Sequence, residues 1–120
     1  MNADINWEQL ALVVGDENEP ADEEMIDLYR LFVEDAGQRL GRISNPAAAV
    51  DATFVAREAH KIRGAASSFG FDRVADILRE VETQINQLGQ VVIQQKLHDA
   101  SAAFQASVRG VAEKFPALAA

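Results

Sequence analysis

The stretch VAREAHKIRGAASSFGFDRVADILREVETQINQL, residues 55–88, decides the fold of this chain. Before Gly70, apolar side chains recur three or four residues apart, and the same spacing resumes after Asp72. This spacing gathers each apolar set on one helical face. Gly70 marks the break between the two helices, and Asp72 is a suitable cap for the second. The stretch therefore predicts a helical hairpin. Its apolar residues are Val55, Ala59, Ile62, Ala66 and Phe69 on the first helix and Val74, Ile77, Leu78, Val81, Ile85 and Leu88 on the second.

Helical spacing also extends to both sides of this hairpin. A short helix is predicted from near Asp4 to Gly15, followed by an acidic loop at about 15–22 and by a long helix that has Pro20 in its first turn and ends at Asn45-Pro46. The hairpin occupies about 50–69 and 72–88, and a last helix runs from 92 to near Pro116. Strand-like alternation is scarce. We predict one all-α domain over residues 1–120, an antiparallel four-helix bundle with an additional short N-terminal helix. The flanking apolar stripes are Trp7, Leu10, Ala11 and Val14; Met25, Leu28, Tyr29, Phe32, Ala36, Leu40 and Ile43; and Val92, Ile93, Leu97, Ala100, Phe104, Val108 and Val111.

Composition excludes several classes of protein. The 120 residues contain no cysteine, which excludes a disulfide framework and any thiolate metal or redox site. A net charge of −8 argues against nucleic-acid binding, and no run of about 18 apolar residues predicts a membrane span. The chain does not start with a secretory signal. We therefore expect a soluble cytoplasmic protein, a monomer that stands alone from Met1.

The acidity is concentrated at one end of the chain. Residues 1–35 hold 11 acidic side chains against the single base Arg30, a net charge of −10, whereas residues 36–120 carry a net charge of +2. The acidic part is interpreted as a solvated helix face and loop. Residues 55–64 hold three basic side chains against Glu58, so this short segment is itself basic. A local basic patch suits an acidic docking partner.

His60 lies on the polar side of the helix that carries this basic segment. At 100° per residue it is about 160° from the core residue Ile62, so we expect it to face solvent. A neutral imidazole can act as a nucleophile through its unprotonated ring nitrogen. Arg57 and Arg63 are then positioned to steady phosphoryl oxygens. The residues that share the His60 face are Ala56, Arg57, Arg63, Gly64 and Ser67.

Gly64 is unusual because it lies inside this helix, where glycine costs about 1 kcal/mol relative to alanine. Close packing against another helix would explain it, but Gly64 lies on the His60 face and away from the apolar stripe. We interpret the missing side chain as clearance that lets a partner or a phosphate approach the imidazole. Ser67 offers a small polar neighbour on the same face.

Residues 60–70, HKIRGAASSFG, resemble the signature of histidine-containing phosphotransfer (HPt) domains. That signature is His-x-x-Lys-Gly with another glycine six residues further on, and Gly64 and Gly70 match its two glycines. The helix pattern over residues 4–115 is similar to that of the whole domain. The chain departs from the signature at Arg63, where lysine is more usual. Charge is retained there, but a guanidinium differs from an ammonium in hydration and geometry.

The resemblance implies a phosphocarrier in two-component signalling. His60 would accept a phosphoryl group from the aspartyl phosphate of a receiver domain and pass it to a second receiver. The partners would be receiver domains or a hybrid histidine kinase, and Mg²⁺ would belong to the receiver, so this chain would need no cofactor and would have no autonomous kinase activity. The residues that would support the phosphate or face the partner are Arg57, Lys61, Arg63, Gly64 and Ser67.

Other functions are weighed against this one. A helical adaptor that binds a receiver or kinase without being phosphorylated fits the same residues, and a dimerisation-type histidine kinase helix pair is a third possibility. Ser67-Ser68 has no orienting acid on its face for a hydrolase. His98 is expected to be a polar surface residue, and a zinc site is not predicted. The candidate apolar anchors of a docking surface are Leu12, Ile26 and Val33.

Overall fold

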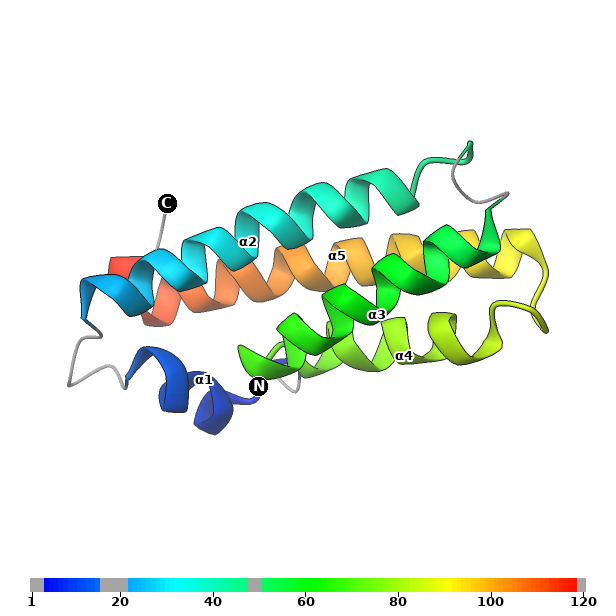
Figure 1. Ribbon diagram of the computed structural model, residues 1–120. Coiled ribbons are helices and arrows are strands. Elements are labelled where there is room, and N and C mark those ends of the chain that lie inside the picture. Colours follow the sequence, from blue (N-terminus) through cyan, green and yellow to red (C-terminus); the bar gives the residue numbers. More distant parts are fainter. Residues whose placement is uncertain (1–3, 16–21, 48–50, 119–120) are drawn as a thin grey trace.

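A computed structural model of the chain describes residues 4–15, 22–47 and 51–118. These residues form α1 (Trp7–Val14), α2 (Glu23–Ile43), α3 (Ala52–Ser68), α4 (Asp72–Gln84), α5 (Gln90–Lys114) and the short 3-10 helix η2 (Pro116–Leu118), and no strand. In Figure 1, α2 and α5 run side by side in opposite directions, α3 and α4 form a hairpin against them, and α1 lies near the start of α2. The predicted all-α bundle with an additional short N-terminal helix is confirmed. No helix in these described ranges is long and apolar enough to cross a membrane.

The starts of the first two helices follow their capping residues. α1 begins at Trp7 and not near Asp4, because the side chain of Asn6 accepts a hydrogen bond from a first-turn amide and acts as the N-cap. Asp22 caps α2 in the same way. Pro20, predicted in the first turn of that helix, and positions 16–21 of the predicted acidic loop lie outside the described residues.

The hairpin forms at the predicted break. Asp51 caps α3, and the helix ends before Gly70, whose φ of +78° is a conformation that favours glycine. Asp72 was predicted to cap α4, and this prediction is wrong. Asp72 is the first residue of the helix, because Phe71 takes the cap position and is fully buried. α4 also ends earlier than predicted, at Gln84. A burial requirement at Phe71 thus overrides the capping preference of the aspartate.

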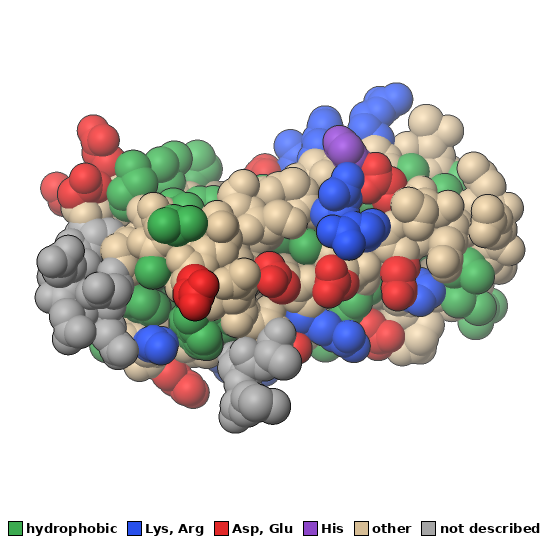
Figure 2. Space-filling model, turned by 90° about the horizontal axis from the view of Figure 1, so that it is seen from below, with side chains coloured by type: hydrophobic (Ala, Val, Ile, Leu, Met, Phe, Trp, Pro, Cys, Tyr) green, Lys and Arg blue, Asp and Glu red, His purple; other side chains and the backbone are tan. Residues whose placement is uncertain are grey.

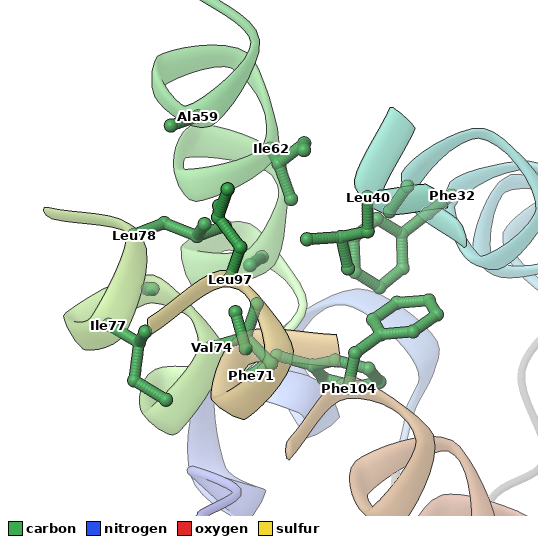
Figure 3. Close-up of a cluster of buried hydrophobic side chains, with 14 of the residues drawn as sticks. Phe32, Leu40, Ala59, Ile62, Phe71, Val74, Ile77, Leu78, Leu97 and Phe104 are labelled. Atoms are coloured by element: carbon green, nitrogen blue, oxygen red, sulfur yellow. The ribbon is translucent and has the colours of Figure 1, made fainter. Parts of the chain in front are cut away.

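The core forms where the apolar stripes of the four long helices meet. Figure 3 shows side chains from α2, α3, α4 and α5 converging, with Leu40, Ile62, Leu78 and Leu97 among them. All four are at most 2% exposed. Burying a leucine or isoleucine side chain contributes roughly 1.5–3 kcal/mol, so this cluster is a main source of stability.

The assignment of two residues to the core is wrong. Leu28 is 46% exposed and Val92 is 45% exposed, while their neighbours Tyr29 and Ile93 are buried. Both lie at the edge of an apolar stripe, where a rotation of about 100° per residue separates the core from the surface. The exposure of Leu28 matters for the surface described below.

The turn between α3 and α4 also fastens α1. The backbone amide of Asn6 donates a hydrogen bond to the carbonyl of Gly70 at 2.7 Å. The side-chain amide of Gln9 donates to the carbonyl of Ser68 at 3.0 Å. These bonds place α1 beside the C-terminal end of α3.

A nearly buried carboxylate joins α2 to α3. Glu58, whose side chain is 7% exposed, accepts two hydrogen bonds of 2.9 Å from Nη1 of Arg39. The Nε of Arg39 donates to Asp35 at 2.9 Å, and Nζ of Lys61 lies 3.7 Å from Glu58. The guanidinium therefore compensates a charge that the fold has taken out of water.

Replacing Arg39 by Met is expected to lower the free energy of unfolding by about 2 kcal/mol, because the Glu58 charge then stays buried without its main partner. The double variant R39M/E58M should be more stable than R39M, since it leaves no buried charge. Urea denaturation measures both values. Equal or greater destabilisation in the double variant would contradict this account.

Candidate functional site

His60 projects into solvent from the middle of α3. Its side chain is 63% exposed, whereas Ala59 and Ile62 on the same helix are fully buried. Figure 2 shows a histidine on one edge of the molecule with lysine and arginine side chains around it. The imidazole is accordingly open to a partner, as its helical phase predicts.

One edge of the imidazole is held by a carboxylate from α4. Nδ1 of His60 lies 2.6 Å from Oε1 of Glu82, and Nε of Arg63 donates a hydrogen bond to Oε2 of Glu82 at 2.8 Å. Nη2 of Arg63 lies 3.2 Å from Nδ1 of His60. Three polar side chains from two helices therefore form one connected group.

The protonation of this group follows from its charges. Burial by itself would raise the pKa of the Glu82 carboxyl, but hydrogen bonds from Arg63 and His60, together with their charges, outweigh it and hold that pKa below its usual value. Glu82 is thus a carboxylate near neutral pH and can only accept hydrogen bonds. Nδ1 of His60 must then carry the proton, and in the neutral ring Nε2 carries the free lone pair.

The other predicted cations are placed differently from Arg63. Lys61 is 52% exposed and its nearest acidic partner is Glu58, on the side of α3 that faces α2. Arg57 is exposed and forms no side-chain hydrogen bond or ion pair within the described part of the chain. Ser67 is exposed on the same helix. Of the predicted cations in the described residues, Arg63 therefore contacts both His60 and Glu82, whereas Arg57 and Ser67 stay exposed on α3.

Gly64 opens the surface one turn beyond His60. A Cβ added at this glycine would meet no atom within 4 Å, so close helix packing does not explain the residue. The glycine is exposed, and the hydroxyl of Ser68 donates to its carbonyl at 3.2 Å. The bare backbone beside the imidazole supports its interpretation as clearance.

Gly64→Ala is expected to raise the free energy of unfolding by up to about 1 kcal/mol, because it removes a mid-helix glycine without a clash. Gly64→Leu should keep the fold but slow by about tenfold or more the phosphoryl transfer to His60 that the resemblance to HPt domains implies, since its side chain obstructs the approach. Urea denaturation and transfer rates measure the two effects. Gly41→Leu is the control, because Gly41 also has open space at its Cβ but lies on α2 beside α5. Wild-type transfer by G64L would contradict the clearance role.

The chain matches a known protein family over most of its length. A family model described as the Hpt domain matches residues 27–114, from the first turns of α2 to the end of α5. The chain belongs to the Hpt domain family. Domains of this family take part in histidine phosphotransfer in phosphorelays, as carriers that interact with receiver domains and histidine kinases. No curated protein and no solved structure matches the chain.

Glu82 is the residue of this Hpt domain that sequence reasoning missed. A signal was present, because His60 and Glu82 both lie 11 residues from Phe71, at the turn of an antiparallel hairpin. Residues equally far from such a turn face one another across the two helices. Glu82 also follows the buried residue Val81, at the border of the apolar stripe of α4. Periodicity alone does not single it out from the other acidic residues of the surface.

An apolar patch of the Hpt domain lies along the same edge as the histidine (Figure 2). Leu12, Leu28 and Leu31 are 81%, 46% and 61% exposed. Of the predicted anchors, Leu12 on α1 is exposed, whereas Ile26 and Val33 are partly buried against the core. Val33 instead lines a cavity of about 530 Å³ between α2 and α5. An exposed group of apolar side chains is typical of a surface that a protein partner covers.

Proposed function

We propose that this protein relays a phosphoryl group between receiver-domain aspartates by way of a phosphohistidine at Nε2 of His60. The observation that carries the proposal is the contact between Nδ1 and Glu82, which leaves Nε2 as the unprotonated nitrogen of an exposed side chain. The coarser assignment, histidine phosphotransfer, follows from the family.

In the transfer step, the Nε2 lone pair attacks the phosphorus of an aspartyl phosphate on the docked receiver. The N–P bond forms as the bond between phosphorus and the aspartyl oxygen breaks, and that oxygen leaves with the electron pair as a carboxylate. Nδ1 keeps its proton in the hydrogen bond to Glu82, and the negative charge of that carboxylate stabilises the positively charged ring. Transfer to a second receiver is the same step in reverse.

The remaining parts of the proposal concern the surroundings of this step. Arg57 and the Gly64 clearance lie on the His60 face, toward the incoming phosphoryl group, and Mg²⁺ is supplied by the receiver. The protein then needs no cofactor of its own and no kinase activity. We propose that it acts in the cytoplasm as a monomer, with receiver domains or a hybrid histidine kinase as partners.

The test is incubation of the full chain with a receiver domain that carries radiolabelled aspartyl phosphate. Labelling with a phosphate that is labile in acid and stable in base is the expected result, because that is the chemistry of a phosphoramidate. An acid-stable phosphate would contradict a phosphohistidine. Tight binding of the receivers without any labelling would instead favour the adaptor function.

The apolar patch of Leu12, Leu28 and Leu31 is proposed as part of the receiver docking surface. Leu31→Glu is expected to weaken receiver binding and to slow transfer by about tenfold at low receiver concentration, because it places a charge in a desolvated contact. Higher receiver concentrations should restore most of the rate. Val91→Glu is the matched control, since Val91 is 80% exposed at the start of α5, away from the patch. Equal rates for L31E and V91E would rule out docking at the patch.

A further inference from the structure

Arg63 occupies the position where the HPt signature has lysine, but its guanidinium is engaged with the protein itself. Its Nε donates to Oε2 of Glu82 at 2.8 Å, and its side chain is only 26% exposed, against 52% for Lys61. The two oxygens of Glu82 are thereby divided, one bonded to Arg63 and the other to His60. Fixing one oxygen of a planar carboxylate restricts where the other oxygen can point.

The remaining contact of Arg63 is with Nδ1 of His60, the ring nitrogen that also contacts Glu82. Its Nη2 lies 3.2 Å from Nδ1 of His60, whereas the phosphoryl group of the proposed function forms on Nε2. A guanidinium nitrogen only donates, and Nδ1 carries a proton, so this contact is not a hydrogen bond. The Glu82 carboxylate bonds to both donors and holds them together.

We propose that Arg63 is a positioning residue, which acts on His60 through Glu82 and not by binding the phosphate. It holds the Glu82 carboxylate in the orientation that keeps the proton on Nδ1 and the lone pair on Nε2. The consequence for transfer depends on the proposed function, but the effect on the ring does not. Arg57, exposed one turn before His60, is the guanidinium available to the phosphoryl oxygens.

The tautomer of His60 tests this directly. In the ¹⁵N-labelled full chain, at about pH 8.5 where imidazoles are neutral, ¹⁵N chemical shifts give the ratio of the Nδ1–H to the Nε2–H form. We expect the Nδ1–H form to predominate in the wild type and the ratio to fall several-fold in R63M and in E82A. Arg57→Met is the matched control, because it removes a guanidinium from the same helix face without touching Glu82, and it should leave the ratio unchanged.

A double-mutant comparison separates action through Glu82 from independent action. If Arg63 works through the carboxylate, R63M/E82A should have the same ratio as E82A alone. Arg63→Lys, which keeps one donor for Glu82, should give a ratio between those of the wild type and R63M. An R63M ratio equal to that of R57M, or R63M and E82A effects that multiply in the double variant, would overturn the proposal.

Transfer rates add a second readout that depends on the proposed function. R63M and R63M/E82A should both transfer about tenfold more slowly than the wild type, with no further loss in R63M/E82A relative to E82A. If the wild type is not phosphorylated at all, the proposed function fails, while the tautomer ratios still decide the role of Arg63.

Discussion

Replacing His60 by Gln is expected to abolish phosphorylation by a phosphorylated receiver, to below about one thousandth of the wild-type rate. Glutamine is similar in size and polarity, but its amide nitrogen has no basic lone pair with which to form an N–P bond. The side chain is 63% exposed, so the substitution should leave the fold intact. Radiolabel transfer and circular dichroism measure the two properties.

The control for this prediction is His98→Gln. His98 is the second histidine of the chain and is exposed on α5, so its replacement should not change labelling. Label retained in a folded H60Q protein would contradict the assignment of His60 as phospho-acceptor. Loss of label in H98Q together with wild-type labelling of H60Q would identify His98 on α5 as the phospho-acceptor.

Replacing Gly70 by Ala is expected to have the largest effect on stability, a loss of about 3 kcal/mol or more. The residue has a φ of +78°, which a side chain disfavours, and an added Cβ would clash with the carbonyl oxygen of Asn6 and lie 3.1 Å from the amide nitrogen of Leu10. Both contacts are to backbone atoms, which cannot swing aside. The turn therefore has to deform, or α1 has to leave it.

Urea denaturation measures the loss, and Gly64→Ala provides an internal comparison. The two variants make the same chemical change 6 residues apart in one segment, yet Gly64 has open space at its Cβ and Gly70 does not. Their effects should therefore have opposite signs. A G70A protein within about 1 kcal/mol of the wild type would show that the contact between the turn and α1 is easily rearranged.

Much of the fold could be predicted from local patterns. Apolar spacing located the helices of the bundle, because a helix that buries one face requires apolar residues every three or four positions. The same phase placed His60 outward and Ile62 inward. Gly70 marked the end of α3, since a chain reversal with positive φ favours glycine.

Errors arose at the borders of these patterns. Leu28 and Val92 were assigned to the core although both are nearly half exposed, because hydrophobicity alone does not say how wide the buried stripe is. Glu58 was read as an ordinary charge of the basic segment, although its side chain is nearly buried against Arg39. Whether a neighbouring helix covers a border position depends on the packing of that helix.

For this protein, the residue pattern was enough to predict the helical architecture, the outward imidazole and the bare backbone at Gly64, because all three depend on the period of a single helix. The packing of α3 against α4 determines which nitrogen of His60 is free and directs Arg63 to Glu82. Those properties require side chains 19 and 22 residues apart to meet across two helices. Periodicity carries no information on such pairs, because it describes each helix separately, whereas hydrogen bonds between helices depend on the register in which they pack.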